Sequence, residues 1–191
     1  MWYNNNAIAI DSGEPGQDGN VAAINFLSMC DGFLFAKRGE QIMTQDEIFM
    51  KEALKEAAKA RKKDEVPIGA IIVHNNKIIA KGHNLRETKH DALGHAEIIA
   101  IRKANKKLKS WRLVDCTIYV TVEPCSMCAG AILQSRIDRI VYGTEDIKGG
   151  ALGSSYNLFE QKNINHIPEI ESGVLKEECS QIIKEFFKKK R

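Results

Sequence analysis

The chain has 191 residues, of which 43% are hydrophobic and 28% are charged, with a formal net charge of +3. This length fits one domain, or one domain with an appendage, and the apolar fraction is large enough for a sizeable core. The five cysteines are too sparse and too irregularly spaced for a disulfide scaffold, so we expect a reduced, intracellular chain.

The first 42 residues differ from the rest. They hold two basic and five acidic side chains, whereas the remaining 149 residues hold 26 Lys and Arg against 20 Asp and Glu. Residues 12–20 are rich in turn-forming types. The apolar stretch 21–36 is too short for a membrane span and is interrupted by Asn25 and Asp31, so we expect neither a span nor a secretory signal. The mild basic bias of the rest is compatible with a polyanionic partner.

Organised sequence begins at Met43. We therefore interpret residues 1–42 as a leader or start-site extension outside the fold, and residues 43–191 as the functional domain. The alternative is that the first segment forms an extra hairpin packed on the domain.

The predicted elements alternate between helices and strands. A capping box at 44–47 begins a helix that runs to about Arg61. Strands are expected where short β-branched runs lie between turn signals, with hairpin residues at 74–76. The pattern predicts an α/β layered domain with helices on both faces of the sheet. The expected strands are 68–73, 77–80, 117–122, 139–143 and 167–171, the further helices 95–106, 125–134 and 174–190, and the long loops 84–94 and 144–165.

Four residues carry a pattern of chemical interest: His95 and Glu97, then Cys125 and Cys128 downstream. A structural zinc site takes four protein ligands, whereas a catalytic site leaves one position to water. Here His95, Cys125 and Cys128 supply three ligands, and no further cysteine lies at ligand spacing. The pattern therefore predicts a catalytic zinc site, and it is the signature of zinc-dependent deaminases.

Each residue of the pattern also has a simpler interpretation. A Cys-x-x-Cys pair alone can be a redox pair or half of a structural zinc site. His95 alone can be a core or capping histidine, and Glu97 alone a first-turn glutamate that the helix dipole favours. Together they favour a water-activating site in which Glu97 carries protons between water, a ring nitrogen and a leaving amine. Such a reaction needs no organic cofactor.

Glu123 stands directly before Pro124 and the first cysteine. It can orient a zinc ligand or cap the following helix, and we favour the cap. At the end of the chain, Phe186 and Phe187 are candidates for stacking or for core packing. The Lys-rich residues that follow can lie near phosphates or form a solvated helix end that suits the dipole.

From about residue 44 to 190 the chain resembles the TadA family of bacterial tRNA-specific adenosine deaminases. The matching segments reach well beyond the zinc motif, which alone indicates only the deaminase superfamily. They are 65–70, 83–84, 95–97, 110–113, 119–130, 145–150, 165–166 and 186–187.

The resemblance implies a three-layer α/β/α cytidine-deaminase-like fold with a mixed central sheet. It also implies a cytoplasmic homodimer with one Zn²⁺ per subunit that converts adenosine to inosine at the wobble position of an arginine tRNA anticodon. Asn84 matches the family asparagine that binds the flipped base, although from the residues alone it can simply end a strand. Asp146 and the end of the last helix match the family's channel for the anticodon stem-loop.

The chain departs from the family at residues 92–94, where Ala-Leu-Gly replaces the usual Pro-Thr-Ala before the zinc histidine, so we expect a changed pocket entrance. Two other functions compete with tRNA editing. One is a deaminase of a free base or nucleoside such as cytosine, guanine or cytidine, which needs no anticodon channel. The other is a zinc-bearing RNA-binding subunit without activity, which needs no Glu97.

Overall fold

The computed structural model describes residues 42–190. The interpretation of residues 1–42 as a leader concerns a segment that lies, except for Ile42, outside the described residues.

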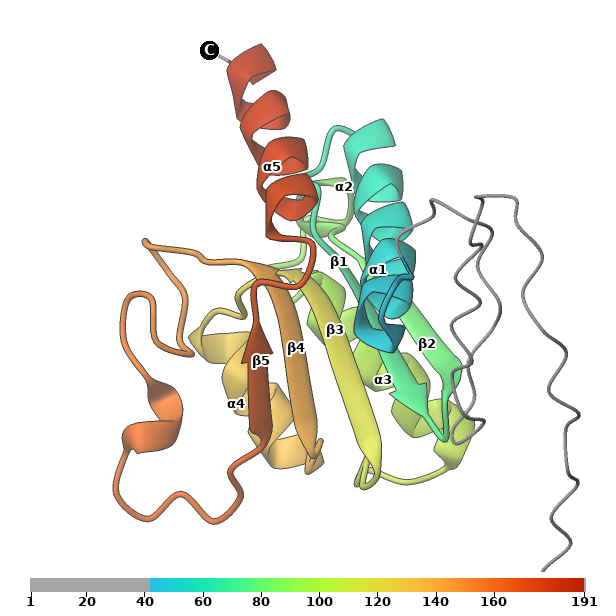
Figure 1. The fold of residues 1–191 in the computed structure, drawn as a ribbon, viewed down its shortest axis with the longest axis vertical. Helices are drawn as coiled ribbons and strands as arrows, with labels where there is room; N and C mark the ends of the chain where they lie inside the picture. Colours follow the sequence, from blue (N-terminus) through green and yellow to red (C-terminus); the bar gives the residue numbers. More distant parts are fainter. Residues whose placement is uncertain (1–41, 191) are drawn as a thin grey trace, which may run out of the picture. The chain divides into compact units, whose positions relative to one another are not determined.

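A five-stranded sheet forms the middle layer of the domain (Figure 1). The strand order is β2-β1-β3-β4-β5, with β1 antiparallel to both β2 and β3, and with β3, β4 and β5 parallel. The sheet is therefore mixed, as expected. The strands are β1 (Gly69–His74), β2 (Lys77–His83), β3 (Cys116–Val122), β4 (Arg139–Thr144) and β5 (Glu169–Ser172).

Helices cover both faces of the sheet, which confirms the three-layer α/β/α arrangement (Figure 1). Successive side chains of a strand point to opposite faces. Accordingly Ile71 packs in the core beside α1 and α5, whereas Ile72 packs in the larger core beside α3 and α4. The long helices are α1 (Gln45–Lys62), α3 (Ala96–Leu108), α4 (Ser126–Ser135) and α5 (Lys176–Lys190).

Two local signals in the sequence predicted boundaries correctly. Thr44 caps α1, and its side chain accepts from the backbone of Glu47 while the Glu47 carboxylate accepts from the backbone of Thr44. Asn75 and Asn76 form the hairpin turn between β1 and β2, both with positive φ, of 49° and 55°. Asparagine tolerates this conformation better than other non-glycine residues.

Two expected loops contain short helices. The segment 84–94 holds the one-turn helix α2 (Arg86–Lys89), and the segment 144–165 holds the 3₁₀ turn η1 (Leu158–Glu160). The strand β2 also extends three residues beyond its expected end, to His83. Within the described residues, none of the helices combines the length and the apolar character that crossing a membrane requires.

Candidate active site

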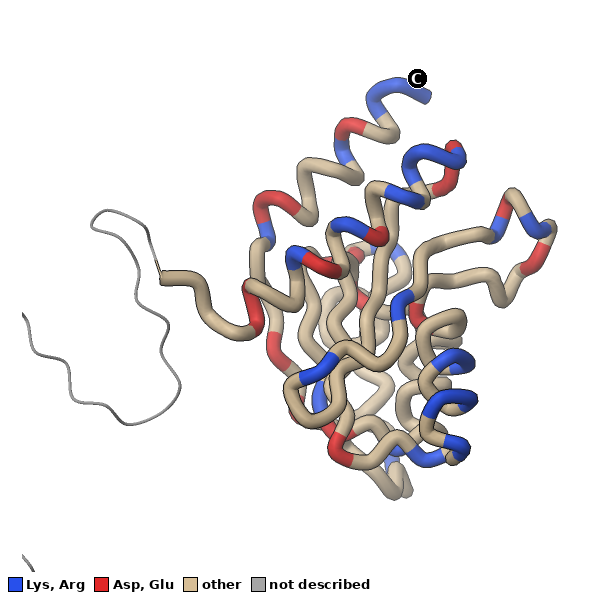
Figure 2. The backbone as a smooth tube through the Cα atoms, turned by 90° about the vertical axis from the view of Figure 1, so that its right-hand side faces the viewer, with Lys and Arg blue, Asp and Glu red and all other residues tan. Residues whose placement is uncertain are grey.

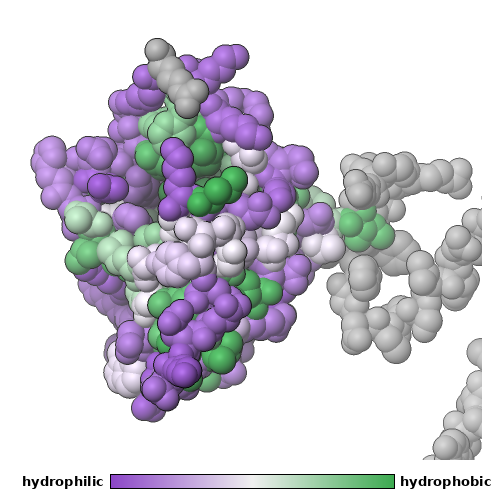
Figure 3. All heavy atoms as spheres, turned by 90° about the vertical axis from the view of Figure 1, so that its left-hand side faces the viewer, coloured by the Kyte–Doolittle hydropathy of each residue, from purple (hydrophilic) through white to green (hydrophobic). Residues whose placement is uncertain are grey.

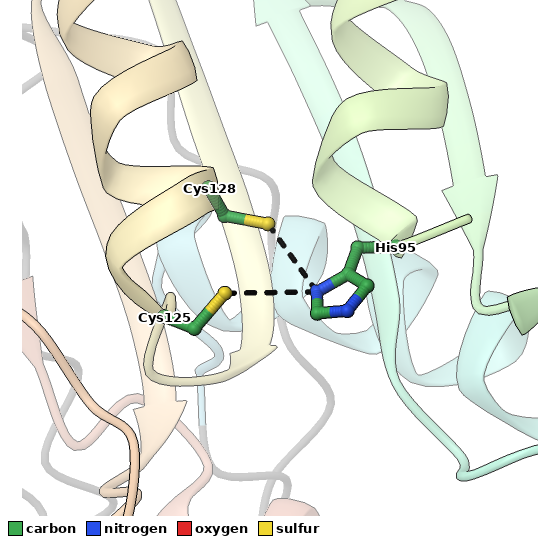
Figure 4. A group of neighbouring side chains, drawn as sticks. All are labelled: His95, Cys125 and Cys128. Atoms are coloured by element: carbon green, nitrogen blue, oxygen red, sulfur yellow. Dashed lines mark hydrogen bonds between the residues drawn. The ribbon is translucent and has the colours of Figure 1, made fainter. Parts of the chain in front are cut away.

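The N-termini of two helices on the same face of the sheet meet at one point (Figure 4). His95 is the N-cap residue of α3 and Cys125 is the N-cap residue of α4, while Cys128 lies in the first turn of α4. The His95 Nδ1 atom lies 3.7 Å from the Cys125 Sγ atom and 3.5 Å from the Cys128 Sγ atom. The structure therefore brings together the three predicted ligands.

Close packing between β2 and α3 fixes the position of His95. A Cβ atom on Gly82 would lie 2.2 Å from the carbonyl oxygen of Ala96, so only glycine lets the helix approach the strand here. Ala96 and Ala100, whose backbones face Gly82, are fully buried. A small residue on the strand and small residues on the helix thus set the height of the helix end above the sheet.

The three donors fit a tetrahedral metal site. Zn–N bonds of about 2.05 Å and Zn–S bonds of about 2.3 Å at a tetrahedral angle separate nitrogen from sulfur by about 3.6 Å. The separations of 3.5 and 3.7 Å between His95 Nδ1 and the two sulfurs agree with this value. Among the described residues these three form the one group of His, Cys, Asp and Glu side chains close enough to hold a metal ion together.

The two thiols differ in acidity because one donates to the other. A hydrogen bond from Cys128 and a second from His95 lower the pKa of Cys125, and they outweigh the opposing effect of burial, so that the pKa is about 4. The same hydrogen bond, together with burial, raises the pKa of Cys128. A coordinated metal ion would reverse this rise, because a coordinating thiol is deprotonated. The exposed N–H groups at the start of α4 favour thiolate in either case.

Glu97 is the second residue of α3 and is only 3% exposed. Its Oε2 atom is buried and accepts no hydrogen bond from the described residues. Burial raises the pKa of this carboxyl group. His95 has φ −74° and ψ 150°, outside the helical region. Its side chain therefore does not follow the angular spacing of the helix, so the side chains of His95 and Glu97 can point toward the same place.

Asn84 follows β2 and is 6% exposed. Its Nδ2 atom donates to the Oε2 atom of Glu65 at 3.3 Å. Glu65 is fully buried and also accepts from the backbone nitrogens of Glu87, at 3.2 Å, and Thr88, at 2.6 Å. Burial alone would raise the pKa of Glu65, but the bonds from Thr88 and its neighbours outweigh it and lower the pKa. Glu65 therefore remains charged, holds α2 in place and fixes the amide of Asn84.

Glu123 does not cap α4, so the predicted cap is wrong; Cys125 occupies the N-cap position. Instead Glu123 accepts backbone hydrogen bonds from the loop after β4. Its Oε2 atom accepts from Asp146 at 3.1 Å, and its Oε1 atom accepts from Leu152 at 2.9 Å and from Ser154 at 3.2 Å. Glu123 is only 3% exposed, and it holds this loop against the segment that precedes the first cysteine.

The loop from Asp146 to Ser154 also touches the metal-ligand segment directly. Cys125 pairs with Gly150 in an isolated β-bridge, and the backbone nitrogen of Ala151 donates to the carbonyl of Pro124 at 3.0 Å. The Asp146 carboxylate accepts from the backbone of Lys148 at 3.1 Å, within the loop itself. Asp146 is thus outside the three-ligand cluster, at the start of a loop that borders it.

Residues 92–94, which depart from the family pattern, form a tight connection into α3. The backbone nitrogen of Gly94 donates to the carbonyl of Asp91 at 2.9 Å. A Cβ atom on Gly94 would lie 2.9 Å from that carbonyl and 3.0 Å from the Cα atom of Arg86. Glycine therefore lets α2 lie closer to the start of α3 than an alanine would, while the neighbouring Leu93 is 45% exposed.

Known proteins share both the sequence and the fold of this domain. The family model of MafB19-like deaminases matches residues 43–191. A tRNA-specific adenosine deaminase from Bacillus subtilis is 52% identical over 149 residues, which span 78% of this chain and 92% of that protein. A second, from Haemophilus influenzae, is 49% identical over 147 residues, which span 76% and 85%. The chain belongs to the tRNA-specific adenosine deaminase family.

Solved structures agree with this assignment. One from a study of A-to-I editing by tRNA:A34 deaminases superposes with a TM-score of 0.67 at 42% identity, covering 71% of this chain and 98% of that one. A guanine deaminase from Nitrosomonas europaea has a TM-score of 0.64 at 21% identity, covering 76% and 86%, and shares the fold alone. The expected cytidine-deaminase-like fold is therefore confirmed, and the chain is a deaminase.

Proposed function

We propose that this chain hydrolyses the exocyclic amine of adenosine at wobble position 34 of tRNA, chiefly an arginine tRNA, and releases inosine and ammonia. The observation that carries this proposal is 52% identity over 149 residues to a tRNA-specific adenosine deaminase. The grouping of His95, Cys125 and Cys128, together with a buried carboxylate whose Oε2 atom has no hydrogen-bond partner among the described residues, supports the reaction class.

The metal that fits the donor set is Zn²⁺, held by the His95 nitrogen and two thiolates. When bound, it supplies a water molecule whose pKa is lowered to about 7. Two thiolates and one neutral imidazole neutralise the charge of the ion, and the site needs no organic cofactor.

Glu97 is the proton carrier. It accepts one proton from the attacking water and delivers it to the ring nitrogen as the new C–O bond forms. It then takes the remaining proton from the added hydroxyl group and delivers it to the amine, so that the C–N bond breaks, the C=O bond forms and ammonia leaves as a neutral molecule. The buried Oε2 atom, which has no hydrogen-bond partner among residues 42–190, is free to do this. Asn84 binds the flipped base. Its Nδ2 atom donates a hydrogen bond to Glu65, so its Oδ1 atom can accept a hydrogen bond from the substrate. Asp146 and its loop contact the anticodon stem-loop.

The assembly that we propose is a cytoplasmic homodimer. Large apolar side chains on the long loop and its end support an interface there, since Ile147 is 79% and Ile167 is 65% exposed. Figure 3 views the side of the domain that carries β5 and this loop, on which hydrophobic patches interrupt the hydrophilic surface. The cytoplasm is where a tRNA substrate is available.

Purified protein is expected to convert adenosine 34 of an arginine tRNA transcript to inosine, read as guanosine after reverse transcription and sequencing. The same transcript with guanosine at position 34 is the control. Intact tRNA together with ammonia release from cytosine, guanine or cytidine would replace this proposal with a free-base or nucleoside deaminase. RNA binding without any release of ammonia would replace it with a non-catalytic subunit.

We further propose that the domain of residues 43–191 is sufficient for activity and that residues 1–42 are a dispensable leader. The family match begins at residue 43, which supports this boundary. A chain started at Met43 is expected to unfold at the same temperature as the full chain, within about one degree, and to edit tRNA at the same rate. A substantial loss of either property would show that the first segment packs on the domain.

A further inference from the structure

Helix α3 carries a row of exposed cations that no carboxylate of the described domain neutralises. The one acidic residue of this helix, Glu97, is buried at its start. Within residues 42–190, neither the exposed cations of α3 nor Lys109, which follows the helix directly, take part in an ion pair. We call this row the α3 cationic face; it consists of Arg102, Lys103, Lys106, Lys107 and Lys109.

The other two long charged helices differ from α3. On α1, Lys59 pairs with Glu56 at 2.6 Å and Arg61 pairs with Glu185 of α5 at 2.9 Å. On α5, Lys176 pairs with Glu145 at 3.0 Å. Figure 2 shows the contrast, with blue residues following one another along α3 and blue mixed with red on α1 and α5. Among the long helices of the described domain, α3 thus differs in carrying exposed cations without an exposed acidic residue on the same helix.

This arrangement is unfavourable for the helix itself. Arg102 lies four residues before Lys106, and Lys103 four residues before Lys107, and like charges at this spacing repel. The helix dipole favours cations in the last turn, which accounts for Lys106 and Lys107 but not for Arg102. Lys103 donates to the carbonyl of Lys81 at 2.7 Å, which fixes its position without removing its charge.

The positive surface continues past the end of α3. Trp111 is 57% exposed, and the guanidinium carbon of Arg112 lies 4.6 Å from the centre of its ring. Asn105 holds this segment by donating to the carbonyl of Trp111 at 3.0 Å. An ordered, exposed aromatic ring beside unneutralised cations suits a nucleic acid, which offers both phosphates and base faces.

The face begins close to the metal site and leads away from it. With a rise of about 1.5 Å per residue, Arg102 lies roughly 10 Å and Lys109 roughly 20 Å along the helix from His95. An RNA strand of that length carries several phosphates. A nucleotide bound at the three-ligand site therefore leaves the rest of its chain within reach of the face.

We propose that the α3 cationic face binds phosphates of the substrate RNA outside the nucleotides that enter the metal site. This inference rests on the proposed function, tRNA editing. A second copy of this chain does not fit the face, because two such surfaces repel each other. The bound phosphates add affinity without touching the reacting base, so the face acts on tRNA binding and not on the chemical step.

The test is the triple variant Arg102→Gln, Lys106→Gln and Lys107→Gln. We expect its KM for a full-length arginine tRNA transcript to rise about tenfold with kcat unchanged, because each phosphate contact adds to affinity. The slope of log KM against log salt concentration should fall by about 2.1–2.7, at about 0.7–0.9 for each of the three lost contacts. The matched control removes three exposed cations from α1, with Lys51→Gln, Lys55→Gln and Lys62→Gln, and should leave both quantities near the wild-type values.

The dissociation constant of the same transcript, measured by filter binding, is a readout independent of catalysis. Wild-type protein that fails to edit tRNA contradicts the proposed function, whatever the variant does. Wild-type protein that edits tRNA, with a triple variant whose KM and salt slope equal those of the α1 control, overturns the proposal for the α3 face alone. A triple variant that loses tRNA affinity only because its oligomeric state changes, as seen by sedimentation, also overturns it.

Discussion

The variant Glu97→Gln is expected to edit tRNA about 10²- to 10⁴-fold more slowly than the wild type while binding the same amount of metal. Gln has the size of Glu but cannot accept and return a proton. The three ligands His95, Cys125 and Cys128 are untouched, so the metal content should stay the same. Inosine formation at position 34 and metal analysis of the purified variant measure the two effects.

The same variant should be at least as stable as the wild type. The Oε2 atom of Glu97 is buried and lacks a partner among the described residues, and burying an unpaired charge is costly. Burial raises the pKa of this carboxyl group for the same reason. Removing the charge relieves this cost, so lost activity together with retained or increased Tm indicates a residue kept for catalysis at the expense of stability.

Glu47→Gln is the matched control, because Glu47 is a first-turn glutamate of another helix, α1. If Glu97 served only to complement the helix dipole, the two variants would behave alike, with a small loss of stability and unchanged editing. An editing rate in Glu97→Gln within tenfold of the wild type, with the metal still bound, would contradict the role of proton carrier.

The grouping of the three candidate ligands was predictable because its pattern is local. Cys125 and Cys128 stand on one turn, and His95 and Glu97 stand at one helix start, so spacing alone placed each pair. The fold class followed from the alternation of strands and helices in the same way. The order of the strands in the sheet did not follow from local patterns, since it depends on pairings between distant segments.

Two buried carboxylates next to the site were not predictable from local patterns. Glu65 bonds to backbone groups 22 and 23 residues away, and Glu123 bonds to groups 23 to 31 residues away. A glutamate beside Pro124 suggested a helix cap because the sequence does not reveal which loop returns to it. The short helix α2 was missed for a related reason: its N-cap Leu85 offers no capping side chain, and Glu65 supplies the acceptor from a distance.

The variant Glu123→Gln is expected to lower Tm by about 4–8 °C, which corresponds to a loss of about 2 kcal/mol. The amide oxygen can replace Oε1 and keep the bonds from Leu152 and Ser154. Its NH₂ group then faces the backbone N–H of Asp146, a donor against a donor, so the start of the loop is released. Differential scanning calorimetry and amide hydrogen exchange at residues 146–154 measure the two consequences, with the exposed Glu160→Gln as the control.

The stability difference should depend on pH in a defined direction. Burial opposes the charge of Glu123, but hydrogen bonds from Ser154, Asp146 and Leu152 outweigh it and lower its pKa in the folded state. A lowered pKa adds stability above the pKa of the unfolded chain, and this stability is lost as the pH falls through the folded-state value. The gap in Tm between wild type and Glu123→Gln should therefore be full at neutral pH and should close under acidic conditions below about pH 4.

Release of the loop should also lower the affinity of the site for the metal. Gly150 and Ala151 bond to the Cys125 and Pro124 backbone, so a loosened loop no longer orients the first cysteine. Loss of groups that orient metal ligands typically lowers metal affinity by about 10- to 100-fold. Competition with a chelator should thus strip the metal from Glu123→Gln at lower chelator concentration than from wild type or Glu160→Gln. Equal metal affinity in all three proteins, with unchanged exchange at Asp146, would show that Glu123 does not hold this loop.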